Sequence, residues 1–339
     1  MKNLLLILLL LLTGEISAQQ TATIVVKTTP DNEIAYWPTG KDHLFFITLG
    51  TKAQADPQGQ FVHEFSVSRP TTIHVWAKGN NSFTLYLTPG SKDTIAVAKD
   101  TINFSGTNRV YNRCLKAVDD YQQYSDNLIY MQPHELEGVT SLEQYHQLAD
   151  ARMKQALDSV NASGLDKEFL AEQRAHIDYT HRSIFLHVAM YLVKNENFTE
   201  NWRKELAEII NQPVDSDYLR SYRGIGLFIN DLIGAQFIKL ENGKPEEIKD
   251  YCAFRFDRYR KFFKGDNLQY AQALLIYEDE FQTRNTPSIP QLYERYKAEF
   301  PNSPFLSVLE PGVNKNLRFQ NSRIDDKDYH ILPCDSTVE

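Results

Sequence analysis

The chain has 339 residues, of which 42% are hydrophobic and 24% charged, and this predicts a globular protein with a core large enough for two domains. Its formal net charge of -8 argues against a general nucleic-acid-binding protein, which needs a basic surface to neutralise phosphates. After residue 18 the sequence has no apolar run of the roughly 20 residues that a membrane-spanning helix needs. We therefore expect no nucleic-acid partner and no transmembrane segment in the mature chain.

The first residues have the order of a secretory signal peptide. Lys2 supplies a positive charge, residues 4–12 form an unbroken apolar run, and small residues precede Gln19. This order predicts export to the periplasm or the medium, with cleavage after Ala18, so that residues 1–18 are absent from the mature protein. No cysteine lies near the cleavage site, and we expect no lipid anchor. A buried N-terminal strand and a membrane anchor are the alternatives.

Segments with alternating or β-branched residues dominate the chain as far as Gly106. The predicted strands are residues 23–27, 43–49, 60–67, 71–78, 82–87 and 94–98. Turn-forming sequences separate them, such as residues 56–59 (DPQG). Within the third strand, Phe61, His63, Phe65 and Val67 would share one face. Short strands at this spacing predict an antiparallel β-sandwich-like domain over residues 21–105.

After Asn108 apolar residues recur at the three- and four-residue steps typical of helices. The clearest stripes are Val110, Cys114, Ala117, Val118 and Tyr121; Ile177, His181, Ile184, Val188 and Tyr191; and Cys252, Phe256, Tyr259 and Phe263. We expect about eight to ten helices over residues 107–318 and a polar tail over residues 319–339. The predicted fold class is therefore α+β, an N-terminal antiparallel β-sandwich-like domain followed by a mostly α-helical domain.

The three cysteines, Cys114, Cys252 and Cys334, are far apart and form no CxxC pair. Neither a dithiol redox centre nor a local zinc knuckle can be built from them. An oxidising compartment permits one disulfide and leaves an odd thiol. The interpretation we prefer is that Cys114 and Cys252 are small core residues.

None of the catalytic and ligand-binding motifs that we tested is complete. His134 begins a zincin-like pattern, but Gly138 stands where the second histidine is needed. His176, His181 and His187 fall on one predicted helix at spacings that do not stack them on one face. A P-loop, a dinucleotide fingerprint and a nucleophile elbow are all missing. The sequence therefore predicts no catalytic, cofactor-binding or metal-ligating residue, no cofactor and no enzyme activity.

A basic cluster interleaved with aromatic residues spans residues 254–264. Its cations are Arg255, Arg258, Arg260, Lys261 and Lys264. Such a pattern forms either an anion or nucleic-acid patch with stacking aromatics or an amphipathic helix with aromatics in the core and cations in solvent. The stripe from Cys252 to Phe263 favours the amphipathic helix.

Four triplets share an aspartate, a hydroxyl residue and then a small or apolar residue. They lie at residues 93–95, 100–102, 158–160 and 335–337. Some exported bacterial proteins carry O-glycans at such triplets, and a modified residue must face solvent because a glycan is bulky and hydrophilic. Chance occurrence is the alternative, since the triplet is short.

Three stretches of this sequence resemble segments of one protein family. Residues 85–91 (LYLTPGS) with 94–97 (TIAV) resemble the strand pair that closes its β domain, residues 102–108 (INFSGTN) the step into its first helix, and residues 296–311 (YKAEFPNSPFLSVLEP) its last helical pair. The family is that of exported TlpA-like thioredoxin-family thiol:disulfide interchange proteins. The likeness covers about residues 20–332, which correspond to the N-terminal region before the thioredoxin domain.

The resemblance implies a protein that continues into a thioredoxin domain with a Trp-Cys-x-x-Cys active site. Here no such motif is present, and no cysteine follows Cys334, so the redox activity of the family is not implied. The chain would then be a truncated or split gene product, or a stand-alone form of the accessory region.

We therefore expect an exported accessory or binding module of a periplasmic thiol:disulfide interchange system, which holds a protein partner or client and lacks the redox centre itself. One alternative is a stand-alone carbohydrate- or surface-binding protein that uses the sandwich loops as its site. Two others are a truncated oxidoreductase whose thioredoxin domain is lost and an enzyme with an unrecognised site.

Overall fold

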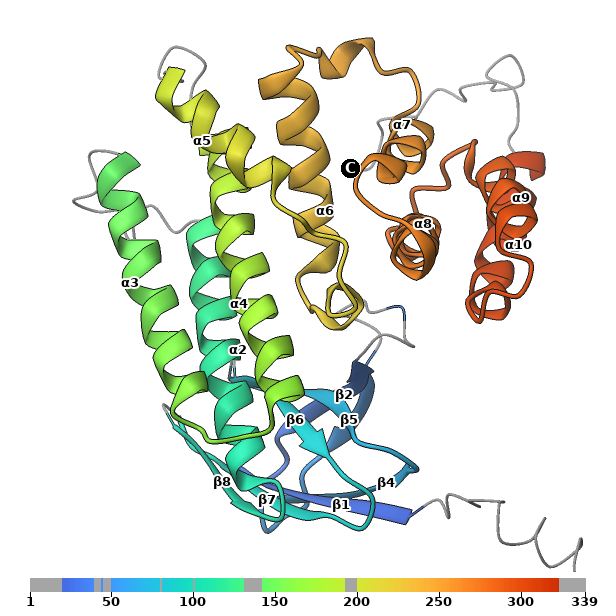
Figure 1. The fold of residues 1–339 in the computed structure, drawn as a ribbon. Helices are drawn as coiled ribbons and strands as arrows, with labels where there is room; N and C mark the ends of the chain where they lie inside the picture. The colour runs from blue at the N-terminus through green and yellow to red at the C-terminus, as the bar shows by residue number, and fades with distance from the viewer. Residues whose placement is uncertain are drawn as a thin grey trace, which may run out of the picture. The chain divides into compact units, whose positions relative to one another are not determined.

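The computed structural model describes residues 20–39, 44, 50–79, 81–99, 101–130, 142–192 and 200–322. Within these residues the chain forms eight strands followed by nine α-helices (Figure 1), which confirms the predicted α+β class and the predicted number of helices. The chain divides into two compact units, the first comprising residues 1–210 and 218–235 and the second residues 211–217 and 236–339. The change from strands to helices at Gly106 falls inside the first unit.

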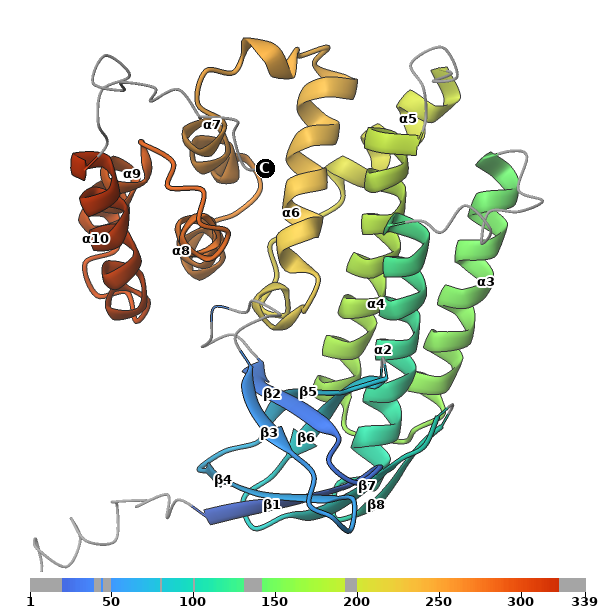
Figure 2. The same cartoon turned by 180° about the vertical axis from the view of Figure 1, so that it is seen from behind.

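The strands form two four-stranded sheets in the first unit. In spatial order, one sheet holds β4 (Gln60–Val67), β1 (Gln20–Lys27), β7 (Lys92–Val97) and β8 (Ile102–Gly106), and the other holds β3 (Thr51–Gln54), β2 (Glu33–Thr39), β5 (Thr71–Ala77) and β6 (Asn81–Leu87) (Figure 2). The pair β1/β7 is parallel, and the other pairs among these strands are antiparallel. Buried residues of both sheets, among them Ile24, Val75 and Phe83, form one core, so the sheets make a sandwich.

Five predicted strands correspond to β1, β4, β5, β6 and β7, and in β4 the side chains of Phe61 and Val67 are buried while Val62 is exposed, as the alternation predicts. The predicted strand at residues 43–49 lies outside the described residues, apart from Leu44. The prediction missed β2, β3 and β8. In β2 the adjacent Ile34 and Ala35 are both buried, and a strand covered on both faces shows no alternation.

Strand β6 is an edge strand of the second sheet, and helix α2 (Arg109–Tyr130) covers that edge. The backbone N–H of Thr84 donates to the Asp119 carboxylate, and that of Tyr86 donates to Asn112 Oδ1 at 2.7 Å. Asn112 and Asp119 are two helical turns apart, so they lie on one face of α2. Edge strands expose unpaired N–H groups that can recruit other chains, and α2 satisfies two of them.

The other helices of the first unit are α3 (Leu142–Asn161), α4 (Lys167–His187), α5 (Glu200–Asn211) and α6 (Ile225–Gly234). On α4 the predicted stripe is confirmed for Ile177, Ile184 and the following Val188, which are buried, whereas His181 is half-buried. On α2 the stripe is partly wrong. Cys114 is buried, but Val110 is 42% exposed, because the buried face of α2 is shared with polar residues that meet the sheet.

The second unit contains α7 (Tyr251–Arg258), α8 (Gly265–Phe281), α9 (Ile289–Glu299) and α10 (Leu306–Ser322). Cys252, Phe256, Tyr259 and Phe263 are buried, which confirms the apolar face of the predicted amphipathic helix, but Arg255 is buried as well, so the expectation that the cations lie in solvent is wrong for one residue of this helix. Its cations pair with acids, as Arg255 does with Glu278, Arg258 and Lys261 with Glu241, and Arg260 with Glu299. Helix α10 continues to Ser322, so the predicted tail begins as helix. Among the described helices, none is long and apolar enough to cross a membrane.

Candidate functional site

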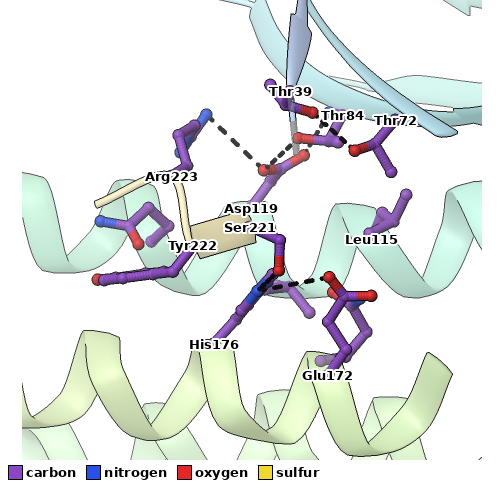
Figure 3. Close-up of a pocket in the computed structure, with 13 residues that line it drawn as sticks. Thr39, Thr72, Thr84, Leu115, Asp119, Glu172, His176, Ser221, Tyr222 and Arg223 are labelled. Carbon is purple, nitrogen blue, oxygen red and sulfur yellow. Dashed lines mark hydrogen bonds and ion pairs between the residues drawn. The ribbon is translucent and has the colours of Figure 1, made fainter. Parts of the chain in front are cut away.

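A cavity of about 50 Å³ lies in the first unit, where the outer face of the second sheet meets helices (Figure 3). We call it the polar cavity. Its lining comprises Thr39, Thr72 and Thr84 from the sheet, Leu115, Val118, Asp119 and Gln122 from α2, Glu172, Gln173 and His176 from α4, and Ser221, Tyr222 and Arg223 from the segment before α6. Four parts of the chain, the sheet, α2, α4 and the segment before α6, therefore converge on one small space.

The threonines reach the cavity because successive strand residues point to opposite faces. In β2, Ile34 and Tyr36 pack into the sandwich core, and Thr39 lies on the other face. The register pairs Thr39 with Thr72, and Thr39 Oγ1 donates to Thr72 Oγ1 at 2.7 Å. The helix-facing side of this sheet is thus polar at the cavity.

Asp119 is the centre of a buried network above the cavity. It accepts hydrogen bonds from the backbone N–H and the hydroxyl of Thr84, the latter at 3.0 Å, and its carboxylate lies 3.7 Å from Arg223 Nη1 (Figure 3). Burial raises the pKa of Asp119, while Arg223 and Thr84 oppose that shift. Burial would make the charge of Asp119 unfavourable on its own, and the nearby Arg223 compensates it.

His74 extends this network into the sheet. Its Nδ1 lies 3.1 Å from Thr84 Oγ1, and its Nε2 contacts Ser82 Oγ and lies 3.0 Å from Arg223 Nη1. Because Thr84 Oγ1 donates to Asp119, it must accept from His74, which assigns the imidazole proton to Nδ1. Burial, with the nearby Arg223, lowers the pKa of His74 well below 6.5, so its ring is neutral at neutral pH.

On the opposite wall, Ser221, His176 and Glu172 resemble a catalytic triad in composition but not in geometry. His176 Nε2 lies 3.0 Å from Ser221 Oγ, and Glu172 lies 3.9 Å from that same nitrogen. In a triad the carboxylate orients the nitrogen that does not contact the nucleophile. The Ser221 hydroxyl also donates to the Tyr218 carbonyl at 3.0 Å, so its proton is not directed at His176. This arrangement does not activate a nucleophile.

The remaining residues that the sequence singled out lie elsewhere. His181 contacts Tyr121 and Asp150, and His187 contacts Asp231, so only His176 of the three helix histidines lines the cavity. The zincin-like start at His134 falls outside the described residues. Within the described residues no group of three or more histidine, cysteine, aspartate or glutamate side chains is placed to hold a metal ion.

Both cysteines that the structure describes are buried and unpaired, which confirms them as core residues. Burial raises the pKa of the Cys114 thiol to about 11 and also raises that of Cys252. Thiolates are the reactive form, so neither side chain is set up for thiol chemistry. Cys334 lies outside the described residues.

The aspartate-hydroxyl triplets differ in how far their hydroxyl residue faces solvent. Ser159 on α3 and Thr101 are exposed, whereas Thr94 within β7 is half-buried. The triplet at residues 335–337 lies outside the described residues.

Sequence reasoning missed Asp119, Gln122 and Arg223. The signal on α2 was present, since Asn112, Asp119, Gln122 and Asp126 recur at helical spacing, but a stripe of polar residues reads as a solvated face unless a partner surface is known. Comparison of the chain with protein-family models, curated proteins and solved structures found no match. The TlpA-like resemblance therefore stays a prediction.

Proposed function

We propose that this chain is an exported accessory or binding module of a thiol:disulfide interchange system, which holds a protein partner or client and performs no thiol chemistry itself. The observation that carries the proposal is the polar cavity. Its hydroxyl groups on Thr39, Thr84 and Ser221, and the imidazole of His176, are all bonded to other protein groups. Such a network suits holding a polar group better than attacking one.

The burial of the two described thiols and the order of sandwich and helices support the same proposal. A sandwich followed by helices is the order expected from the resemblance to the N-terminal region of TlpA-like proteins. The proposed connection to thiol chemistry rests on that resemblance. The proposal includes export, with a mature N-terminus at Gln19. Intact-mass measurement of the exported protein tests this part. A mass that retains residues 1–18, or an added diacylglycerol, would contradict it.

A client-binding assay tests the main proposal. Fluorescently labelled ribonuclease A, reduced and carboxymethylated so that it cannot refold, serves as a model client, and its anisotropy is followed as the mature protein is added. We expect saturable binding for which folded ribonuclease A does not compete. In parallel, insulin reduction by dithiothreitol should proceed no faster than with a cysteine-free variant. Absence of saturable binding, or insulin reduction that disappears in Cys334→Ser, would refute the proposal.

One observation favours the carbohydrate-binding alternative. Tyr36, His63 and Phe65 form a half-buried aromatic cluster on β2 and β4, with ring centroids 4.5 to 5.4 Å apart, in which Tyr36 and Phe65 also pack against the sandwich core. Tyr36 Oη lies 3.1 Å from His63 Nε2, so the cluster combines apolar faces with polar edges. It lies on strands and not on the loops expected from the sequence. Affinity electrophoresis in soluble polysaccharides tests it, with loss of retardation in Phe65→Ala but not in the outward-facing Val62→Ala as the supporting result.

A further inference from the structure

We propose that the polar cavity binds a primary alkylammonium group, supplied by a lysine side chain of a partner or by a small free amine. The inference rests on the proposed binding function and adds the chemistry of the bound group. It follows from the size of the cavity, from its charge, from its hydrogen-bonding groups and from the position of its mouth.

The size of the cavity restricts the ligand to a few atoms. A volume of about 50 Å³ has space for about three water-sized groups at roughly 15 Å³ each. Sites for drug-sized molecules occupy roughly 300–1,000 Å³. The end of an aliphatic amine, a nitrogen with its last carbons, fits this space, and a sugar ring does not.

The charge of the lining favours a cation. Asp119 and Glu172 are acids, whereas Arg223 is the one permanent cation among the lining residues. Arg223 is already engaged by Asp119 at 3.7 Å and by His74 at 3.0 Å. Burial lowers the pKa of His176, so it adds no positive charge at neutral pH. Glu172 is therefore the acid of the lining that has no cation beside it. A partly buried negative charge in that position is unfavourable, and a cationic ligand would neutralise it.

The unused hydrogen-bonding groups of the cavity are mostly acceptors, which also favours a cationic ligand. Three lining hydroxyl groups, those of Thr39, Thr84 and Ser221, donate to Thr72, Asp119 and the Tyr218 carbonyl, whereas Thr72 accepts from Thr39 and keeps its own donor. Two acceptor groups are left over. Glu172 lies 3.9 Å from His176, beyond hydrogen-bond length, and the buried Gln173 Oε1 has no partner within the described chain. An ammonium group has three donors and no acceptor, so it complements this surplus.

The exposure of the wall residues locates the mouth. The Glu172 side chain is 32% exposed, against 16% for Arg223 and 12% for His176, so the cavity opens beside Glu172. A ligand that enters there meets the carboxylate first and the apolar side chains of Leu115 and Val118 deeper in the wall. An ammonium head that pairs with Glu172 therefore binds near the mouth, and its aliphatic stem extends outward from there.

Thermal unfolding of the mature protein with ethylammonium chloride tests the inference, because all three tryptophans, Trp37, Trp76 and Trp202, lie in the first unit and report its unfolding. We expect a saturable rise in the midpoint, with a Kd on the order of 1 mM for so small a ligand. Equal concentrations of ethanol, sodium acetate and potassium chloride should give no saturable rise. The peptide Gly-Lys-Gly and its lysine-acetylated form separate the two sources, since tighter binding of the unmodified peptide than of ethylammonium indicates a lysine side chain.

Variants on α4 supply the controls. Glu172→Gln keeps the shape and should weaken ethylammonium binding by at least about tenfold. Glu168→Gln, an exposed residue one turn earlier, should bind as the wild type does. Equal midpoint rises with ethanol, or equal affinity in Glu172→Gln, would overturn the inference and leave ordered water as the occupant. Client binding without amine binding would overturn this inference alone, and amine binding without client binding would overturn the proposed function alone.

Discussion

Replacing Asp119 with alanine should destabilise the first unit strongly. The carboxylate accepts two hydrogen bonds from Thr84 and faces Arg223 at 3.7 Å. Its side chain is 10% exposed and that of Arg223 16% exposed, so solvent screens the pair weakly. The alanine variant would leave the N–H of edge strand β6 and the guanidinium without this partner.

The expected loss is about 3 kcal/mol of the free energy of unfolding. A buried donor left unsatisfied costs about 1–3 kcal/mol, and breaking a buried ion pair by removing one member costs about 3–5 kcal/mol. The lower end applies because Arg223 also contacts His74 and is not fully buried. Asp119→Asn keeps an acceptor for the Thr84 N–H and avoids ionising a carboxyl whose pKa burial raises, so it should lose only about 1 kcal/mol.

Urea unfolding followed by tryptophan fluorescence measures these differences in the first unit. The neighbouring Asp120, which is exposed and paired with Lys116, supplies the matched control, and Asp120→Ala should change stability by less than about 0.5 kcal/mol. If Asp119→Ala and Asp120→Ala were equally stable, the carboxylate would not hold α2 to β6 and the reasoning would be wrong.

Three further predictions concern a histidine, the thiols and a glycine. Burial lowers the pKa of His74 well below 6.5, so the folded state opposes its protonation and stability is lost as pH falls below 6.5, by up to about 1.4 kcal/mol per pH unit. Urea titrations at neutral and mildly acidic pH should show a smaller loss for His74→Gln; equal losses would exclude this cause. Cys114 and Cys252, whose thiol pKa values burial raises, should react with dithionitrobenzoate only after unfolding, and peptide mapping that finds either labelled in the native protein would contradict this. Gly106→Ala should lower stability by about 2 kcal/mol or more, because φ is 110° and the new Cβ would lie 2.2 Å from the Lys92 carbonyl oxygen; an unchanged urea midpoint would show that the turn tolerates a side chain.

Most strands that the sequence predicted have one face more buried than the other, although β5 buries His74 as well as Ile73 and Val75. In β4 the buried Phe61 alternates with the exposed Val62, and the predicted bounds match the strand. Strand β2 alternates in neither polarity nor burial, since the sandwich core covers Ile34 and the other face is covered at Trp37. Strand β3 is short and mostly exposed, so it lacks the apolar residues that would mark it. Periodicity therefore identifies a strand most readily when its two faces differ, but the short β8 was missed although Phe104 is buried between two exposed residues.

The sequence did not predict the polar cavity, because a buried polar face of a helix has the same sequence pattern as a face in solvent. The α4 stripe was found because Ile177 and Ile184 pack against other apolar groups, whereas Asn112 and Asp119 are buried by a sheet whose facing side is polar. No property of α2 alone distinguishes that polar face from one in solvent. Arg223 is more than 100 residues away in the sequence, and its place beside Asp119 and His74 depends on how the helices fold back onto the sheet.

The hydrogen bonds between β6 and α2 fix the position of the helix more strictly than apolar packing would. Apolar packing is non-directional, so α2 could slide along β6 by one turn at modest cost if only apolar groups met there. Here Asn112 and Asp119 accept from the N–H groups of Tyr86 and Thr84, and a shift of one turn would leave both donors unsatisfied in a buried place. The same bonds that protect the edge strand therefore fix the register of α2, and with it the distance between the three threonines and the α4 wall. The cavity keeps its small volume because hydrogen bonds, and not packing alone, set the position of the helix that lines it.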